Sequence, residues 1–148
     1  MHKTLWSCII GCSLLTACAA MHPRTERIAK QQTCEGGGAC VVEVSVDCER
    51  FYGCELSADY DLVLVTGRGK GTDIVWRLRG ETGAHFARNG IVIDSSEFEC
   101  APRSDREFAC TDKHSDFGVF KYRVNVTLPE SPFGARGVPS LDPWIVNN

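Results

Sequence analysis

The sequence predicts an all-β domain, an antiparallel β-sandwich of about seven strands, and three observations predict it. After Cys34, short runs of apolar and β-branched residues recur between turn residues, with Gly and Pro among them. No stretch of that part repeats apolar residues with the period of about 3.6 that an amphipathic helix requires. From Phe120 onward, the run Val119–Leu128 alternates apolar and polar side chains, as a half-buried antiparallel strand does. A small closed barrel is the alternative.

The expected strands follow one another from residue 41 onward. Val41–Val46 alternates apolar and polar residues, and Tyr60–Thr66 is a nearly continuous apolar run. The long run Val119–Leu128 is also expected to be a strand. Three shorter runs before it and one after it are expected to be strands as well. These are Ile74–Leu78, Gly90–Asp94, Glu107–Cys110 and Trp144–Val146.

The alternation in the long strand also predicts the core. Its odd-numbered positions carry Lys121, Arg123, Asn125 and Thr127, and these are expected to face solvent. The residues expected to face the core are Phe120, Tyr122, Val124 and Val126, together with Trp76 and either Val63 or Leu64.

Four short stretches in the second half of the chain carry a resemblance. They are "IVWRL", the turn and strand "NGIVI", the strand "YRVNV" and the terminal "LDPWIVN". Their order resembles that of small exported bacterial immunoglobulin-like modules of unknown function, over Asp73–Asn148. The resemblance implies an immunoglobulin-like sandwich and brings no activity with it.

The first residues have the three parts of an export signal. Lys3 supplies a positive charge, Leu5–Ala17 is uncharged and mostly apolar, and small residues follow. As a helix the apolar run would span about 20 Å, at about 1.5 Å per residue, which is less than the hydrocarbon core of about 30 Å. It is therefore interpreted as a signal peptide and not as a membrane span.

The four residues Leu15-Thr16-Ala17-Cys18 resemble the lipobox of bacterial lipoproteins. In that family the cysteine thiol takes a diacylglyceryl group, the signal is cut before it, and the new amino terminus is acylated. The resemblance implies that Cys18 is lipidated and anchors the chain, since two or more acyl chains hold a protein stably on a bilayer. Ala19 is not the aspartate of an inner-membrane retention signal, which favours the outer membrane. The alternative is ordinary cleavage after Ala19 or Ala20, which would leave a soluble periplasmic protein.

The expected organisation is a signal peptide at 1–17, a flexible tether at 18–33 and one disulfide-braced domain at 34–148. The tether is polar, contains Pro23 and lacks periodicity. The formal net charge of the whole chain is -3, and charges of both signs alternate along it. This pattern indicates a solvated surface and gives no footprint for nucleic acid.

Nine cysteines are present, and six remain once Cys8, Cys12 and Cys18 are assigned to the signal and the anchor. An even number in an exported domain predicts disulfides, although sequence alone does not choose the pairing. Short spacings favour the local pairs Cys100–Cys110, Cys34–Cys40 and Cys48–Cys54. Crossed pairs such as Cys34–Cys48 and Cys40–Cys54 are the alternative.

Three patterns that could carry chemistry do not complete a known site. "TGRGKGT" lacks the Gly-Lys-Ser/Thr end and the following helix of a phosphate-binding loop, so it is interpreted as a hairpin loop. Cys110 and His114 are spaced as the ligands on one loop of a blue-copper site are, and His85 is the candidate for the second imidazole. Such sites usually also have a Met ligand, and no Met follows His114. His114 is therefore expected to be an exposed loop histidine. Glu97 and Glu99 are expected on the solvated face of a strand.

No catalytic residue, metal or cofactor is therefore predicted. The sequence favours a non-catalytic binding or structural module of the cell envelope. Its expected partners are the bilayer, through Cys18, and an envelope protein or polymer. A periplasmic inhibitor or immunity protein against a toxin or a cell-wall hydrolase is the alternative.

Overall fold

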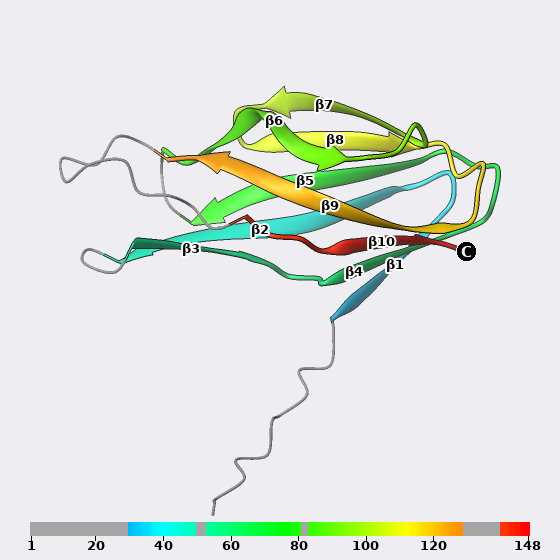
Figure 1. The fold of residues 1–148 in the computed structure, drawn as a ribbon, viewed down its shortest axis with the longest axis horizontal. Coiled ribbons are helices and arrows are strands. Elements are labelled where there is room, and N and C mark those ends of the chain that lie inside the picture. Colours follow the sequence, from blue (N-terminus) through cyan, green and yellow to red (C-terminus); the bar gives the residue numbers. More distant parts are fainter. Residues whose placement is uncertain (1–29, 50–52, 81–82, 129–139) are drawn as a thin grey trace, which may run out of the picture.

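The computed structural model describes residues 30–49, 53–80, 83–128 and 140–148, which form ten strands and no helix (Figure 1). Within these residues no helix is present that could cross a membrane. The strands are β1 (Gln31–Glu35), β2 (Ala39–Glu49), β3 (Gly53–Ala58), β4 (Leu62–Thr66), β5 (Thr72–Gly80), β6 (His85–Ile93), β7 (Phe98–Ser104), β8 (Glu107–Asp112), β9 (Gly118–Thr127) and β10 (Trp144–Asn147).

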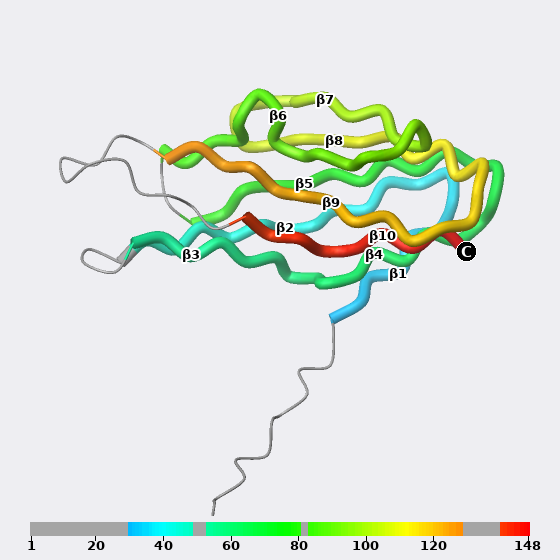
Figure 2. Tube along the Cα trace, viewed as in Figure 1, coloured from blue at the N-terminus to red at the C-terminus, as the bar shows by residue number. Residues whose placement is uncertain are grey.

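The strands form two five-stranded sheets. The first sheet has the order β1-β4-β10-β9-β6, and the second has the order β3-β2-β5-β8-β7. Figure 2 shows the two sheets lying one over the other, and neither closes into a barrel. The predicted sandwich is confirmed.

Both sheets are mixed, whereas an antiparallel arrangement was expected. β10 pairs antiparallel with β9 but parallel with β4, and β1 also lies parallel to β4. In the second sheet β2 and β5 are parallel. These pairs arise because the chain crosses repeatedly between the sheets, after β1, β3, β4, β5, β6 and β8, so successive strands are not always neighbours.

Three strands are additional to the seven expected, namely β1, β3 and β7. All three are sheet edges. Edge strands bury few side chains, and in β7 only Phe98 is buried while Pro102 sits beside an irregularity in the pairing. A strand with so little apolar surface gives no alternating signal in the sequence.

The expected tether overlaps the domain by three residues. Gln31, Gln32 and Thr33 belong to β1 and pair with Leu62 and its neighbours, and the backbone N–H of Lys30 donates to Asp61. The expected signal peptide, Cys18 and the tether up to residue 29 lie outside the described residues.

The core confirms the period of two in β9. Tyr122 and Val124 are buried, Phe120 and Val126 are partly buried against them, and Lys121 and Arg123 are exposed. Trp76 of the opposite sheet is fully buried, and its ring meets that of Tyr122 edge-on at 5.2 Å between centroids. Burial raises the pKa of Tyr122 to about 12, so this phenol stays un-ionised deep inside the sandwich. Of the two alternatives in β4, Val63 is the buried one.

Three disulfides brace the sandwich. Cys48–Cys54 joins β2 to β3, and Cys100–Cys110 joins β7 to β8, each between residues directly opposite in the register. Cys34–Cys40 closes the turn from β1 to β2 and so ties the two sheets together. These are the local pairs that the short spacings favour. Three disulfides indicate an oxidising, extracytoplasmic compartment.

Candidate binding site at the loop end of the sandwich

Several connections meet at one end of the sandwich, on the right in Figure 1, and we call it the loop end. It contains the turn 35–38, the loop 67–71, the turn 94–97 and the connection 113–117. We call the connection 113–117 the binding loop. β1 and β4 both run toward this end, where Gly36 N donates to Thr66 O and Gly37 N donates to Gly71 O. The two sheets therefore bring segments far apart in the sequence to one surface.

The binding loop is fastened on one side by the loop 67–71. Nε and Nη2 of Arg68 both donate to the carbonyl of Ser115, at 3.2 and 3.0 Å. The N–H of Gly69 donates to the carbonyl of His114 at 3.0 Å. The positive φ of Gly67 and Gly69 lets this loop turn tightly toward the binding loop.

On its other side the binding loop is fastened by Glu97. Its carboxylate accepts hydrogen bonds from the hydroxyl and N–H of Ser115, at 2.6 and 2.8 Å, and from the N–H of Asp116 at 3.3 Å. The bonds from Ser115 lower the pKa of Glu97, which keeps this carboxylate ionised. Glu97 lies just before β7, whereas Glu99 lies within the strand and pairs with Lys113 Nζ at 2.9 Å.

A buried polar cluster of Asp112, His114 and Asn147 supports the binding loop from below. Asp112 Oδ1 accepts from the N–H of His114 at 2.8 Å and from Asn147 Nδ2 at 3.2 Å. His114 has a positive φ of 47°, which the bond from its N–H to Asp112 helps to hold. Asp112 Oδ2, both ring nitrogens of His114 and Asn147 Oδ1 have no hydrogen-bond partner within the described part of the chain. Burial raises the pKa of Asp112, because an ionised carboxylate is poorly solvated there.

The replacement Asp112→Asn is expected to change how stability depends on pH. The folded-state pKa of Asp112 lies above the unfolded value, so the folded form binds the proton more tightly. The free energy of unfolding of the wild type, relative to that of the variant, should therefore rise as pH falls from 7 toward the unfolded pKa of about 3.9. Urea unfolding of both proteins at several pH values measures this difference. A difference that is constant, or that shrinks on acidification, would contradict the assignment.

Phe117 ends the binding loop and points outward. It is 60% exposed, which is unusual for a large apolar side chain on a loop that is otherwise firmly held. The guanidinium of Arg68 lies 4.6 Å from the centre of its ring. Lys70 is also exposed at this end. The loop end thus presents an aromatic ring beside the guanidinium of Arg68, with Lys70 exposed at the same end.

Two candidates from the sequence differ from expectation here. His114, expected to be an exposed loop histidine, is fully buried, because the binding loop folds back over the end of the core. "TGRGKGT" is a crossover from the first sheet to the second and not a hairpin, since β4 and β5 lie in different sheets. The N–H groups of Gly69 and Lys70 already donate to carbonyls of the chain. A strand follows, so the helix that a phosphate-binding loop needs is missing there.

The copper ligands considered in the sequence are not brought together. Cys110 is bonded to Cys100, so it has no thiolate to offer. His85 pairs with Thr127 at one end of β9, whereas His114 precedes the other end, roughly 30 Å away at about 3.4 Å per residue. No group of three potential metal ligands occurs in the residues that the structure covers.

Phe117 and Arg68 are the functional candidates that the sequence did not single out. Phe117 lies between Asp116 and Gly118, outside any alternating run. Its only signal is an aromatic residue in a polar connection, and the partner that positions it lies 49 residues earlier in the chain at Arg68.

A comparison with known protein families finds no match, and a comparison with curated proteins finds none either. Among solved structures, the chain is similar to a cysteine protease inhibitor from Entamoeba histolytica, at 11% sequence identity and a TM-score of 0.35. The alignment covers 74% of this chain and 95% of that chain. Similarity at this level carries no argument about activity or partners.

Proposed function

We propose that this protein is a non-catalytic binding module, anchored in the cell envelope, whose loop end docks a protein partner. The observation that carries the proposal is Phe117, which is exposed on a loop that Arg68, Glu97 and Asp112 hold in place. A large apolar side chain that is left 60% exposed adds little to the stability of the fold. Its rigid presentation supports a role in recognition.

The chemistry of the loop end suggests what the partner offers. Aromatic and arginine side chains dominate the energetics of protein interfaces, and a loop fixed beforehand loses little conformational entropy on binding. Phe117 fits an apolar pocket, and Arg68 and Lys70 favour carboxylates at the rim of that pocket. We propose a protein surface of this kind as the partner.

The placement of the amino terminus supports a tethered arrangement. The described chain enters at Lys30, and β1 then runs toward the loop end for about 17 Å, at about 3.3 Å per residue (Figure 1). A lipid on Cys18 would hold the protein through the start of β1 and not through the loop end. The loop end would then stay open to partners in the periplasm.

The inhibitor or immunity hypothesis is a finer version of the same proposal. In that version the partner's pocket is the groove of a toxin or a cell-wall hydrolase, and Phe117 enters it. An activity assay on the identified partner, with and without this protein, separates inhibition from plain docking.

The docking proposal predicts an effect confined to Phe117. With a photoreactive phenylalanine analogue at position 117, the lipoprotein should crosslink to a partner in its own envelope, whereas the analogue at Thr127 should not. The partner, once identified and purified, should bind Phe117→Ala about 30-fold more weakly, the loss expected for an interface hot spot. Thr127→Ala is the matched control and should bind as the wild type does. Equal binding by Phe117→Ala would rule out the loop end as the docking site.

The anchor is tested separately at Cys18. Cells fed a clickable fatty acid should label the wild-type protein, and Cys18→Ser should remove the label. The labelled protein should fractionate with the outer membrane, as expected from Ala19. Unlabelled wild-type protein recovered in the soluble periplasm would overturn the anchor and leave the docking proposal standing.

A further inference from the structure

The outer faces of the two sheets differ in chemistry. The second sheet carries charged residues on β2, β5, β7 and β8 that are paired with one another. The pairs are Arg79–Glu43 at 2.6 Å, Arg77–Glu107 at 2.9 Å, Arg103–Asp73 at 2.8 Å and Arg103–Glu107 at 3.8 Å. These charges are paired within the chain and wetted by solvent, so they have little to gain from a partner.

The first sheet instead carries exposed apolar residues on its outer face. Trp144 is 45% exposed and Val119 is 63% exposed. The register places Trp144 beside Leu62, and Val119 beside Val146, which is itself next to Leu64. These five residues form one continuous patch across β9, β10 and β4, which we call the apolar strip.

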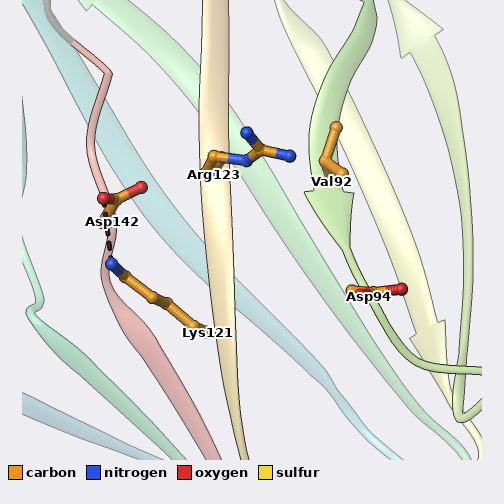
Figure 3. A pocket seen from close by; sticks show the side chains of 5 residues that line it. All are labelled: Val92, Asp94, Lys121, Arg123 and Asp142. Carbon is orange, nitrogen blue, oxygen red and sulfur yellow. Dashed lines mark hydrogen bonds and ion pairs between the residues drawn. The ribbon is translucent and has the colours of Figure 1, made fainter.

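A charged hollow of about 340 Å³ adjoins the apolar strip, lined by Val92, Asp94, Lys121, Arg123 and Asp142 (Figure 3). Lys121 Nζ pairs with Asp142 at 3.0 Å and lies 5.8 Å from the centre of the Trp144 ring. Figure 3 shows Arg123 reaching across the hollow from β9 toward Val92. Arg123 and Asp94 form no hydrogen bond or ion pair with any other residue in the described ranges. Within the described residues, Arg123 and Asp94 are thus left without a partner.

We propose that a second copy of this chain docks on the outer face of the first sheet. A face that offers both an unpaired cation and an unpaired anion matches itself under twofold symmetry, because each Arg123 can pair with Asp94 of the other copy. A partner of a single charge sign would leave one of the two groups unpaired. Of the loop end this surface includes only Asp94, so Phe117 is not part of the dimer contact.

The strand register makes the pairing specific. Arg123 lies opposite Val92, and Asp94 continues β6 by one residue to the level of Lys121. A twofold axis that sets Arg123 against Asp94 of the second copy runs diagonally across the strands, through Lys121 and Val146. The same axis sets Trp144 against Val119 of the second copy, so apolar surface covers apolar surface. The strands of the two copies then cross at a steep angle, as in orthogonal sheet packing.

The test uses the full chain in its own envelope, carried by two copies with different tags. A photoreactive phenylalanine analogue at Val119 should crosslink one tagged copy to the other, and the adduct should map to Trp144. Arg123→Asp and Asp94→Arg should each lower the yield of this adduct about tenfold, because each sets two like charges against one another. The double variant Arg123→Asp/Asp94→Arg should restore it to about the wild-type level. Arg77→Asp, the same change on the second sheet, should leave the yield unchanged.

Each other outcome overturns the dimer. Adducts of Val119 with a different protein would assign the face to that protein, and adducts with lipid would place the face on the bilayer. The absence of an adduct between the two tagged copies would show that a second copy of the chain does not bind this face. Failure of the double variant to restore the yield would contradict the Arg123–Asp94 pairing.

Discussion

Replacing Trp76 by alanine should lower the free energy of unfolding by about 3–5 kcal/mol, a large part of the stability of a small domain. Trp76 has no exposed surface, and it is the largest side chain buried between the two sheets. Its ring packs edge-on against Tyr122 of β9, so its removal opens a cavity where the sheets meet. Urea or thermal unfolding of the oxidised protein measures the change.

The adjacent residue provides the control. Arg77 points to solvent and forms an exposed ion pair with Glu107, so Arg77→Ala should cost about 0.5 kcal/mol or less. Similar losses for the two variants would show that Trp76 and Arg77 do not lie on opposite faces of β5.

Reduction of all three disulfides should lower the free energy of unfolding by roughly 6–9 kcal/mol, since each short loop contributes about 2–3 kcal/mol. A sum of this size is comparable to the whole stability of a small domain, so the reduced protein should be largely unfolded at 37 °C. Unfolding curves with and without reductant, followed by tryptophan fluorescence, measure the effect.

Replacing the pairs by alanine one at a time separates their contributions. Removal of Cys34–Cys40 should cost the most, because both side chains are buried in the core and their bond ties β1 to the second sheet. Cys100 lies exposed on an edge strand, so the loss of Cys100–Cys110 should reflect chain entropy and the burial of Cys110 alone. If the reduced protein kept the unfolding midpoint of the oxidised protein, the disulfides would not be the braces of this fold.

The parts of the fold that the sequence predicts are those in which burial alternates along the chain. Tyr122 and Val124 follow a period of two because one side of β9 faces the core and the other faces water. The polar edge strand β1 has no such contrast, and nothing in its residues reveals that it pairs with β4. Parallel pairing also cannot be predicted from the residues of a single strand. It depends on which two strands become neighbours after the chain has crossed between the sheets.

The loop end was beyond prediction for a related reason. Phe117, Arg68 and Glu97 come from three connections, and each appears as an ordinary polar turn when taken alone. Only the crossover after β4 and the hairpin of β7 and β8 bring them together. The burial of His114 likewise depends on the return of β10, whose Asn147 bonds Asp112 beneath it.

The position of β10 has a consequence for how the protein is made. This strand, Trp144–Asn147, lies between β4 and β9 in the interior of the first sheet. During synthesis β4 can pair with β1, and β9 can pair with β6, but these two pairs cannot join until residues 144–147 have been made. The first sheet is therefore completed last, when β10 inserts between β4 and β9.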